Sequence, residues 1–183
     1  MNKVVKTSRF FKRVFTLIFW GWPIVLALIW FQPQEDFLAA WGLNISNFLP
    51  IGLFDHIVTP LSPSTKAWGF AISFIPMIIG MLISWLFIRL FQGYEQNDIF
   101  SLKSIRILKR IALVMILGVI LDPIYQALIS FAMTMHNPPG FRLITLYIGA
   151  GSIRTLITAG LIYLIAYIMQ EGVKLREEQA LTI

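Results

Sequence analysis

Four long apolar blocks constrain this chain more than any other feature of its sequence. They cover residues 14–31, 68–91, 111–135 and 143–169. A helix needs about 20 apolar residues, at a rise of about 1.5 Å each, to cross the hydrocarbon core of a bilayer. Every block is long enough. A chain that is 57% hydrophobic and 13% charged cannot bury four such helices inside a soluble domain. The sequence therefore predicts an all-α integral membrane protein, a four-helix bundle.

Little of the chain lies outside these blocks. Of its 183 residues, the four spans leave two short ends, short links and one long outer loop at 32–67. That leaves no space for a separate soluble catalytic module, and we expect a single transmembrane domain over residues 1–183.

The basic residues indicate the orientation. Twelve of the fifteen Lys and Arg residues lie at the two ends of the chain or in and beside the link 92–110. Under the positive-inside rule, both termini are then cytoplasmic and the loop 32–67 is external. The net charge of +6 therefore reports topology, and we expect no direct binding of nucleic acid.

The third block carries a polar face. Every fourth residue from Arg110 reaches the series Gly118, Asp122, Gln126, Ser130 and Thr134, which shares one side of a helix. That side must avoid lipid, and small-residue faces on the second and fourth blocks predict that neighbouring helices cover it.

Two charges lie deep in the last two blocks. Asp122 and Arg154 are each about eleven residues into their blocks, counted from opposite ends, so the helix rise predicts the same depth for both. A lone charge there costs about 2.5 to 3.5 kcal/mol on insertion scales. The sequence therefore predicts an intramembrane ion pair, with Gln126 and Thr158 nearby. Pro123 removes a helical N–H beside it and predicts a kink.

Two interpretations of this polar site remain open from the residues alone. The pair can fix the register and orientation of the last two helices, as buried polar pairs do in some proteins. Alternatively, Asp122 is a proton or cation site whose neutralisation releases Arg154, with Pro123 as the hinge. The second interpretation makes the protein a channel or transporter subunit. Because four spans are few for transport, it also requires a homo-oligomer.

A second group of charges stands where the third helix enters the membrane. Lys103, Arg106 and Arg110 follow the i, i+3, i+7 spacing of one helix face, and Asp98 is the expected N-cap of that helix. Such a stripe fits an acidic protein partner or anionic lipid headgroups, and ordinary positive-inside anchoring is the simpler explanation. With the charged end of the chain, the predicted cytoplasmic docking patch comprises Asp98, Lys103, Arg106, Arg110, Lys174 and Arg176.

Catalytic and metal-binding patterns are missing from the sequence. It contains no cysteine, and His56 and His136 stand outside the apolar blocks without metal-ligand spacing. It also has no nucleophile–base motif and no phosphate-binding loop. We expect a protein that is not an enzyme and that needs no metal or cofactor.

Short motifs point to a family. The segments 94–101 and 171–178, together with Leu121-Asp122-Pro123 and the final Leu181-Thr182-Ile183, resemble a bacterial membrane family catalogued as domain of unknown function 2975. The resemblance covers roughly residues 90–183. It implies a four-helix protein of the bacterial inner membrane, often encoded beside a small helix-turn-helix regulator, and therefore a tethering or sensing role toward that cytoplasmic partner. It carries over no catalytic residues.

Overall fold

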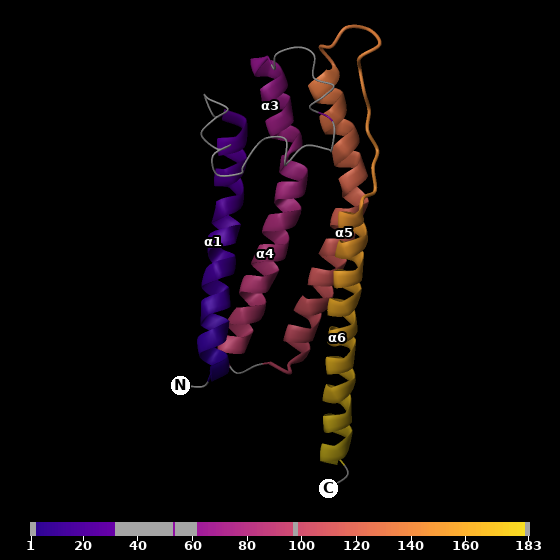
Figure 1. Ribbon diagram of the computed structural model, residues 1–183. Coiled ribbons are helices and arrows are strands. Elements are labelled where there is room, and N and C mark those ends of the chain that lie inside the picture. The colour runs from indigo at the N-terminus through magenta and orange to yellow at the C-terminus, as the bar shows by residue number, and fades with distance from the viewer. Residues whose placement is uncertain (1–2, 32–52, 54–61, 97–98, 182–183) are drawn as a thin grey trace. The chain divides into compact units, whose positions relative to one another are not determined.

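The computed structural model of the chain describes residues 3–31, 53, 62–96 and 99–181. These residues form helices and the turns and extended chain between them, with no strand in the described ranges. Figure 1 labels the helices, which are α1 (Lys3–Phe31), α3 (Pro63–Ile72), α4 (Phe74–Glu95), α5 (Leu102–Thr134) and α6 (Ala150–Leu181).

Four helical stretches are long and apolar enough to cross a membrane: α1, α3 together with α4, α5, and α6. The predicted all-α class and the four spans are confirmed, and the protein is a multi-pass membrane protein. The cytoplasmic position of both termini stays a prediction.

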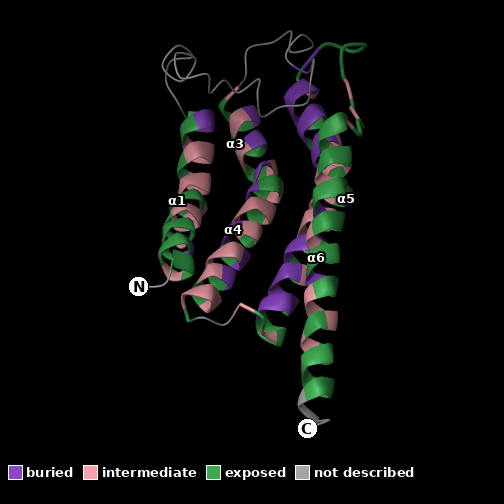
Figure 2. Ribbon diagram, turned by 60° about the horizontal axis from the view of Figure 1, so that its bottom comes forward, coloured by how far each residue is buried: buried purple, intermediate pink, exposed green. Residues whose placement is uncertain are grey.

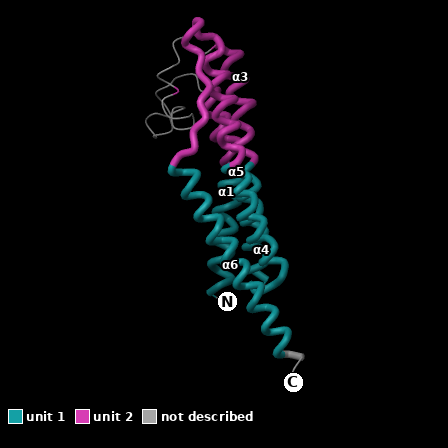
Figure 3. Tube along the Cα trace, turned by 90° about the vertical axis from the view of Figure 1, so that its right-hand side faces the viewer, with its two compact units in different colours: residues 1–20, 79–119, 150–183 teal, residues 21–78, 120–149 magenta. Residues whose placement is uncertain are grey.

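The chain folds as two compact units (Figure 3). Unit 1 consists of Met1–Trp20, Ile79–Val119 and Ala150–Ile183, and unit 2 consists of Gly21–Ile78 and Ile120–Gly149. The helices α1, α4 and α5 contribute to both units, whereas α6 belongs to unit 1.

Apolar contacts between helices form the core of unit 1. Ile111 is completely buried, and the residues around it come from α4, α5 and α6. Aromatic rings add a second layer, because Phe15 of α1 stacks on Phe87 of α4 with ring centroids 4.5 Å apart. Figure 2 shows the buried positions of α5 in purple. The buried residues of this core are Leu86, Leu90, Ile105, Ile107, Leu108, Ile111 and Ala166.

The core of unit 2 is built around Trp30, which is 3% exposed. Its ring lies directly against the backbone of Gly69, where an added Cβ would overlap the indole. A larger residue at Gly69 therefore has no space without moving Trp30. The buried residues of this core are Ile29, Trp30, Leu53, Tyr125, Ile129 and Met133.

The second span, Pro63–Glu95, has one interruption, at Ser73 between α3 and α4. Ser62 caps α3 by accepting the Thr65 N–H at 3.2 Å, and Pro63 occupies the first turn, as helix starts favour. The break falls at Ser73, whose hydroxyl donates to the Gly69 carbonyl at 2.7 Å. Its cause is Pro76, because a proline has no N–H to offer to the carbonyl four residues earlier.

The start of α5 differs from the prediction. Ser101 is the N-cap, since its hydroxyl oxygen accepts the Ser104 N–H at 3.1 Å. The predicted cap, Asp98, lies outside the described residues. The predicted continuity of the link with the third span is correct, because α5 runs unbroken from Leu102 to Thr134.

The fourth span begins later than residue 143. Residues 141–149 form extended chain, here called the extended segment, and α6 starts at Ala150. Hydrophobicity alone could not reveal this, because a run of apolar residues fits an extended chain as well as a helix. At its far end, α6 continues past the apolar block to Leu181.

Candidate functional site

The polar face of α5 binds the extended segment within unit 2. The Leu143 N–H donates to Thr134 Oγ1 at 3.0 Å, and the Thr145 N–H donates to Ser130 Oγ at 2.9 Å. The hydroxyl groups of Ser130 and Thr134 thus accept backbone hydrogen bonds that the carbonyls of a neighbouring strand would accept in a sheet. Gln126, Ser130 and Thr134 of this face are buried, and within unit 2 they bond to non-helical backbone, where the sequence predicted cover by neighbouring helices.

Gln126 makes the third of these contacts and is the centre of the site. Its side chain is 8% exposed. One amide N–H donates to the Tyr147 carbonyl at 2.9 Å, and the other donates to Asp122 Oδ2 at 2.7 Å. The carboxamide therefore ties the acid of the third span to the last residues before α6.

The extended segment has two different edges. Leu143, Thr145 and Tyr147 direct peptide groups toward α5, as alternate residues of an extended chain do. In the part of the chain that the structure describes, the peptide groups of Ile144 and Leu146 have no hydrogen-bond partner. Non-helical backbone at membrane depth is tolerated where protein buries it or where it lines a water-filled cavity. The edge of this segment that faces α5 is the part whose backbone groups are satisfied by protein.

The predicted ion pair between Asp122 and Arg154 stays a prediction. Asp122 belongs to unit 2, where its carboxylate accepts the Gln126 amide. Arg154 belongs to unit 1, four residues after the start of α6, with an exposed side chain. The prediction of equal depth counted residues from a fourth helix that starts at residue 143. Because α6 starts at Ala150, that count does not hold.

The two other predicted members of the site lie in regular helix. Pro123 is inside α5, and the helix continues through it. Thr158 donates its hydroxyl to the Arg154 carbonyl of its own helix at 2.9 Å. A hydroxyl bonded in this way is satisfied locally.

A basic surface lies on unit 1 and contains the cations of the predicted docking patch. The side chains of Lys103, Arg106 and Arg110 are exposed on α5. Among the described residues, no carboxylate forms an ion pair with any of these three. On α6, Lys174 is paired with Glu171 at 3.0 Å. We define the basic surface as Lys103, Arg106, Arg110, Lys174 and Arg176.

The packing of α5 against α6 brings the two halves of this surface to neighbouring helices. Ile105 and Ile111 of α5 share one core with Ala166 of α6. At the edge of that core, Lys109 donates to Gln170 Oε1 at 2.5 Å. The buried face of α5 is thus apolar, and its basic stripe is left facing outward.

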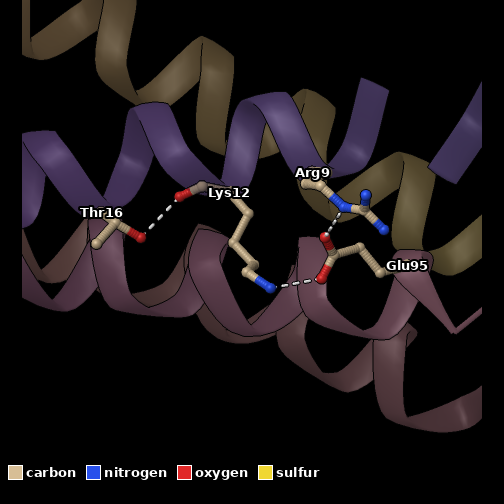
Figure 4. Close-up of polar contacts among 4 residues, drawn as sticks. All are labelled: Arg9, Lys12, Thr16 and Glu95. Atoms are coloured by element: carbon tan, nitrogen blue, oxygen red, sulfur yellow. Dashed lines mark hydrogen bonds and ion pairs between the residues drawn. The ribbon is translucent and has the colours of Figure 1, made fainter. Parts of the chain in front are cut away.

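Two ion pairs join α1 to α4 in unit 1, and the sequence did not predict them. Glu95 accepts Lys12 Nζ at 2.5 Å and Arg9 Nε at 3.4 Å (Figure 4). The Glu95 side chain is 16% exposed. The sequence feature that could have indicated these ion pairs is an acidic residue directly after an apolar span, on the same predicted side of the membrane as a terminus rich in Lys and Arg.

No metal centre is found among the described residues, which contain no cluster of three or more His, Asp or Glu side chains suited to an ion. The structure adds two residues that the sequence did not single out, Thr145 and Tyr147. The sequence indicated a role for these two residues only indirectly, because the hydroxyls of Ser130 and Thr134 require polar partners.

The sequence model of one family, described as protein of unknown function (DUF2975), matches residues 53–183. This match covers well over half of the chain, and the protein belongs to that family. The match begins before residue 90, so it includes the second span, which the resemblance did not. No curated protein and no solved structure matches the chain.

Proposed function

We propose that the protein is a small regulatory protein of the bacterial inner membrane, without enzymatic activity. It holds a soluble cytoplasmic partner, such as a helix-turn-helix regulator, at the basic surface of unit 1. The single observation that supports this proposal is the stripe of exposed, unpaired cations on α5.

The charge pattern favours a protein with an acidic surface as the partner. Three cations spaced over about two helical turns present a line of charge rather than a point. Complementary charge raises the rate of encounter and fixes orientation. The buried side of this part of the helix is occupied by the core of unit 1.

Anionic lipid headgroups are the competing occupant of this surface. The triple variant Lys103→Gln, Arg106→Gln and Arg110→Gln distinguishes the two. Its matched control is Lys3→Gln, Lys6→Gln and Arg13→Gln, which removes three exposed cations of α1. Both proteins should insert into the membrane, which a cell-fractionation assay measures.

The regulator is then quantified after purification of the full-length protein from native membranes. We expect the α5 variant to lose the regulator and the α1 control to retain it. Equal retention by both variants contradicts docking. If only binding to anionic vesicles falls in the α5 variant, the stripe serves lipid.

Movement of protons or cations, as a channel or transporter subunit, is the second candidate function. The contact of Asp122, Gln126 and the Tyr147 carbonyl favours it, because an ionisable residue of a span beside non-helical backbone is typical of ion sites in transporters. This function requires a homo-oligomer. Flux into vesicles should be lost in Asp122→Asn, and flux equal to that of the native protein contradicts the role.

A further inference from the structure

Two buried oxygen atoms of unit 2 have no hydrogen-bond partner among the described residues. They are Gln126 Oε1 and Thr145 Oγ1. Both come from the contact between α5 and the extended segment. A buried polar atom without a partner costs about 1 to 3 kcal/mol, so a pair of them at one contact calls for an explanation.

The hydrogen bonds of Gln126 fix the direction of its free oxygen. Both amide hydrogens are used, one by Asp122 Oδ2 at 2.7 Å and one by the Tyr147 carbonyl at 2.9 Å. Turning the amide over would place its oxygen against a carboxylate and a carbonyl. The free oxygen is therefore a fixed part of the site.

Oxygen acceptors outnumber donors at this contact. The Asp122 carboxylate is bonded to the Gln126 amide, whose own oxygen is free, and the free hydroxyl of Thr145 belongs to the residue whose N–H is bonded to Ser130, four residues after Gln126 on α5. Within the described part of unit 2, no cationic side chain forms an ion pair with Asp122. Such a group of oxygens lacks positive charge.

We propose that Asp122, Gln126 and Thr145 form a binding site for a small monovalent metal cation. One carboxylate with neutral oxygens matches a single charge, whereas calcium sites use several carboxylates. Oxygen atoms of protein groups within the membrane are the ligands that sodium meets in transporters. The proposal deepens the second candidate function and rests on it only in centring the site on Asp122.

The test is direct binding of sodium by the purified full-length protein in detergent. Titration with NaCl at constant ionic strength, balanced by the large organic cation N-methylglucamine, should give saturable binding of one ion per chain. Asp122→Asn should abolish it. Thr145→Val should weaken it about tenfold, because one neutral ligand is lost while the Thr145 N–H bond to Ser130 is kept.

The matched control is Thr155→Val, which removes a hydroxyl that bonds to the Gly151 carbonyl of its own helix. We expect its affinity for sodium to equal that of the native protein. If sodium gives no saturable signal above N-methylglucamine, water satisfies these oxygens and the proposal is wrong. Native affinity in Asp122→Asn or in Thr145→Val also overturns it.

The proposed binding site and the transport function can each be rejected without rejecting the other. Sodium bound without flux into vesicles retains the site and rejects the transport function. Flux without saturable binding rejects the site. If Asp122→Asn does not fold, Thr145→Val decides the outcome, because it keeps the carboxylate and every hydrogen bond described above.

Discussion

Unit 1 and unit 2 share three helices, but different interactions stabilise the interior of each unit. In unit 1, apolar side chains of α4, α5 and α6 pack around Ile111, and its charges lie at the ends of helices. In unit 2, the extended segment is bound to Gln126, Ser130 and Thr134 of α5 by hydrogen bonds. Because lipid offers no hydrogen bonds, the extended segment of unit 2 depends on individual polar side chains, whereas the contacts between helices in the core of unit 1 depend on the shape of apolar side chains.

The predicted ion pair of Asp122 with Arg154 has the largest expected effect, if the pair forms in the membrane. Removing one member of a buried pair costs about 3 to 5 kcal/mol. Asp122→Leu should therefore lower the free energy of unfolding, measured in detergent, by about that amount. Adding Arg154→Met should restore most of it. No rescue by the second change contradicts the pair.

Activity of the stable double variant then separates the two interpretations of the pair. Full activity in vesicles or in partner retention eliminates a proton or cation role, and a stable but inactive protein eliminates a purely structural role. Any loss in the free energy of unfolding that remains in the double variant measures the hydrogen bond that Gln126 no longer donates to the carboxylate.

Thr134→Val tests the dependence of unit 2 on single hydroxyls. The change keeps the shape of the side chain and leaves the Leu143 N–H without its acceptor, which should cost about 1 to 3 kcal/mol. Thr155→Val in α6 is the control, because its hydroxyl serves only its own helix. Equal thermal stability of the two variants would remove the distinction between the units.

Glu95→Gln has the smallest expected effect. The change breaks the contacts with Arg9 and Lys12 in unit 1, but ion pairs at a water-facing helix end contribute little. We expect a lower thermal midpoint than in the native protein, with a smaller loss than in Thr134→Val. Added salt should reduce the difference. A loss larger than that of Thr134→Val would make charge, and not packing, the main support of unit 1.

The sequence predicts the four spans because length and apolar composition are sufficient for that conclusion. It also places Asp122 and Gln126 on one helix face, and the structure bonds them at 2.7 Å. It does not predict Ser101 as the cap of α5, since Asp98 fits the same preference. Nor does it predict the extended segment, because residues 143–148 are equally apolar in either conformation.

The remaining features depend on contacts between residues far apart in the chain. Thr145 looks like any hydroxyl near a span until its N–H meets Ser130, and Glu95 has no visible partner until α1 lies beside α4. Such contacts follow from the packed structure, whereas helix spans follow from local hydrophobicity.

The most direct measurement is a proline scan of residues 143–148, with alanine at the same positions to account for lost side chains. Proline has no N–H. Thermal stability in detergent should fall at Leu143 and Thr145, whose N–H groups are bonded to α5, and should change little at Ile144 and Leu146. A helix starting at residue 143 would instead tolerate proline throughout its first turn and lose stability at Tyr147 and Ile148. That second pattern would contradict the extended segment, and with it the difference between the two units.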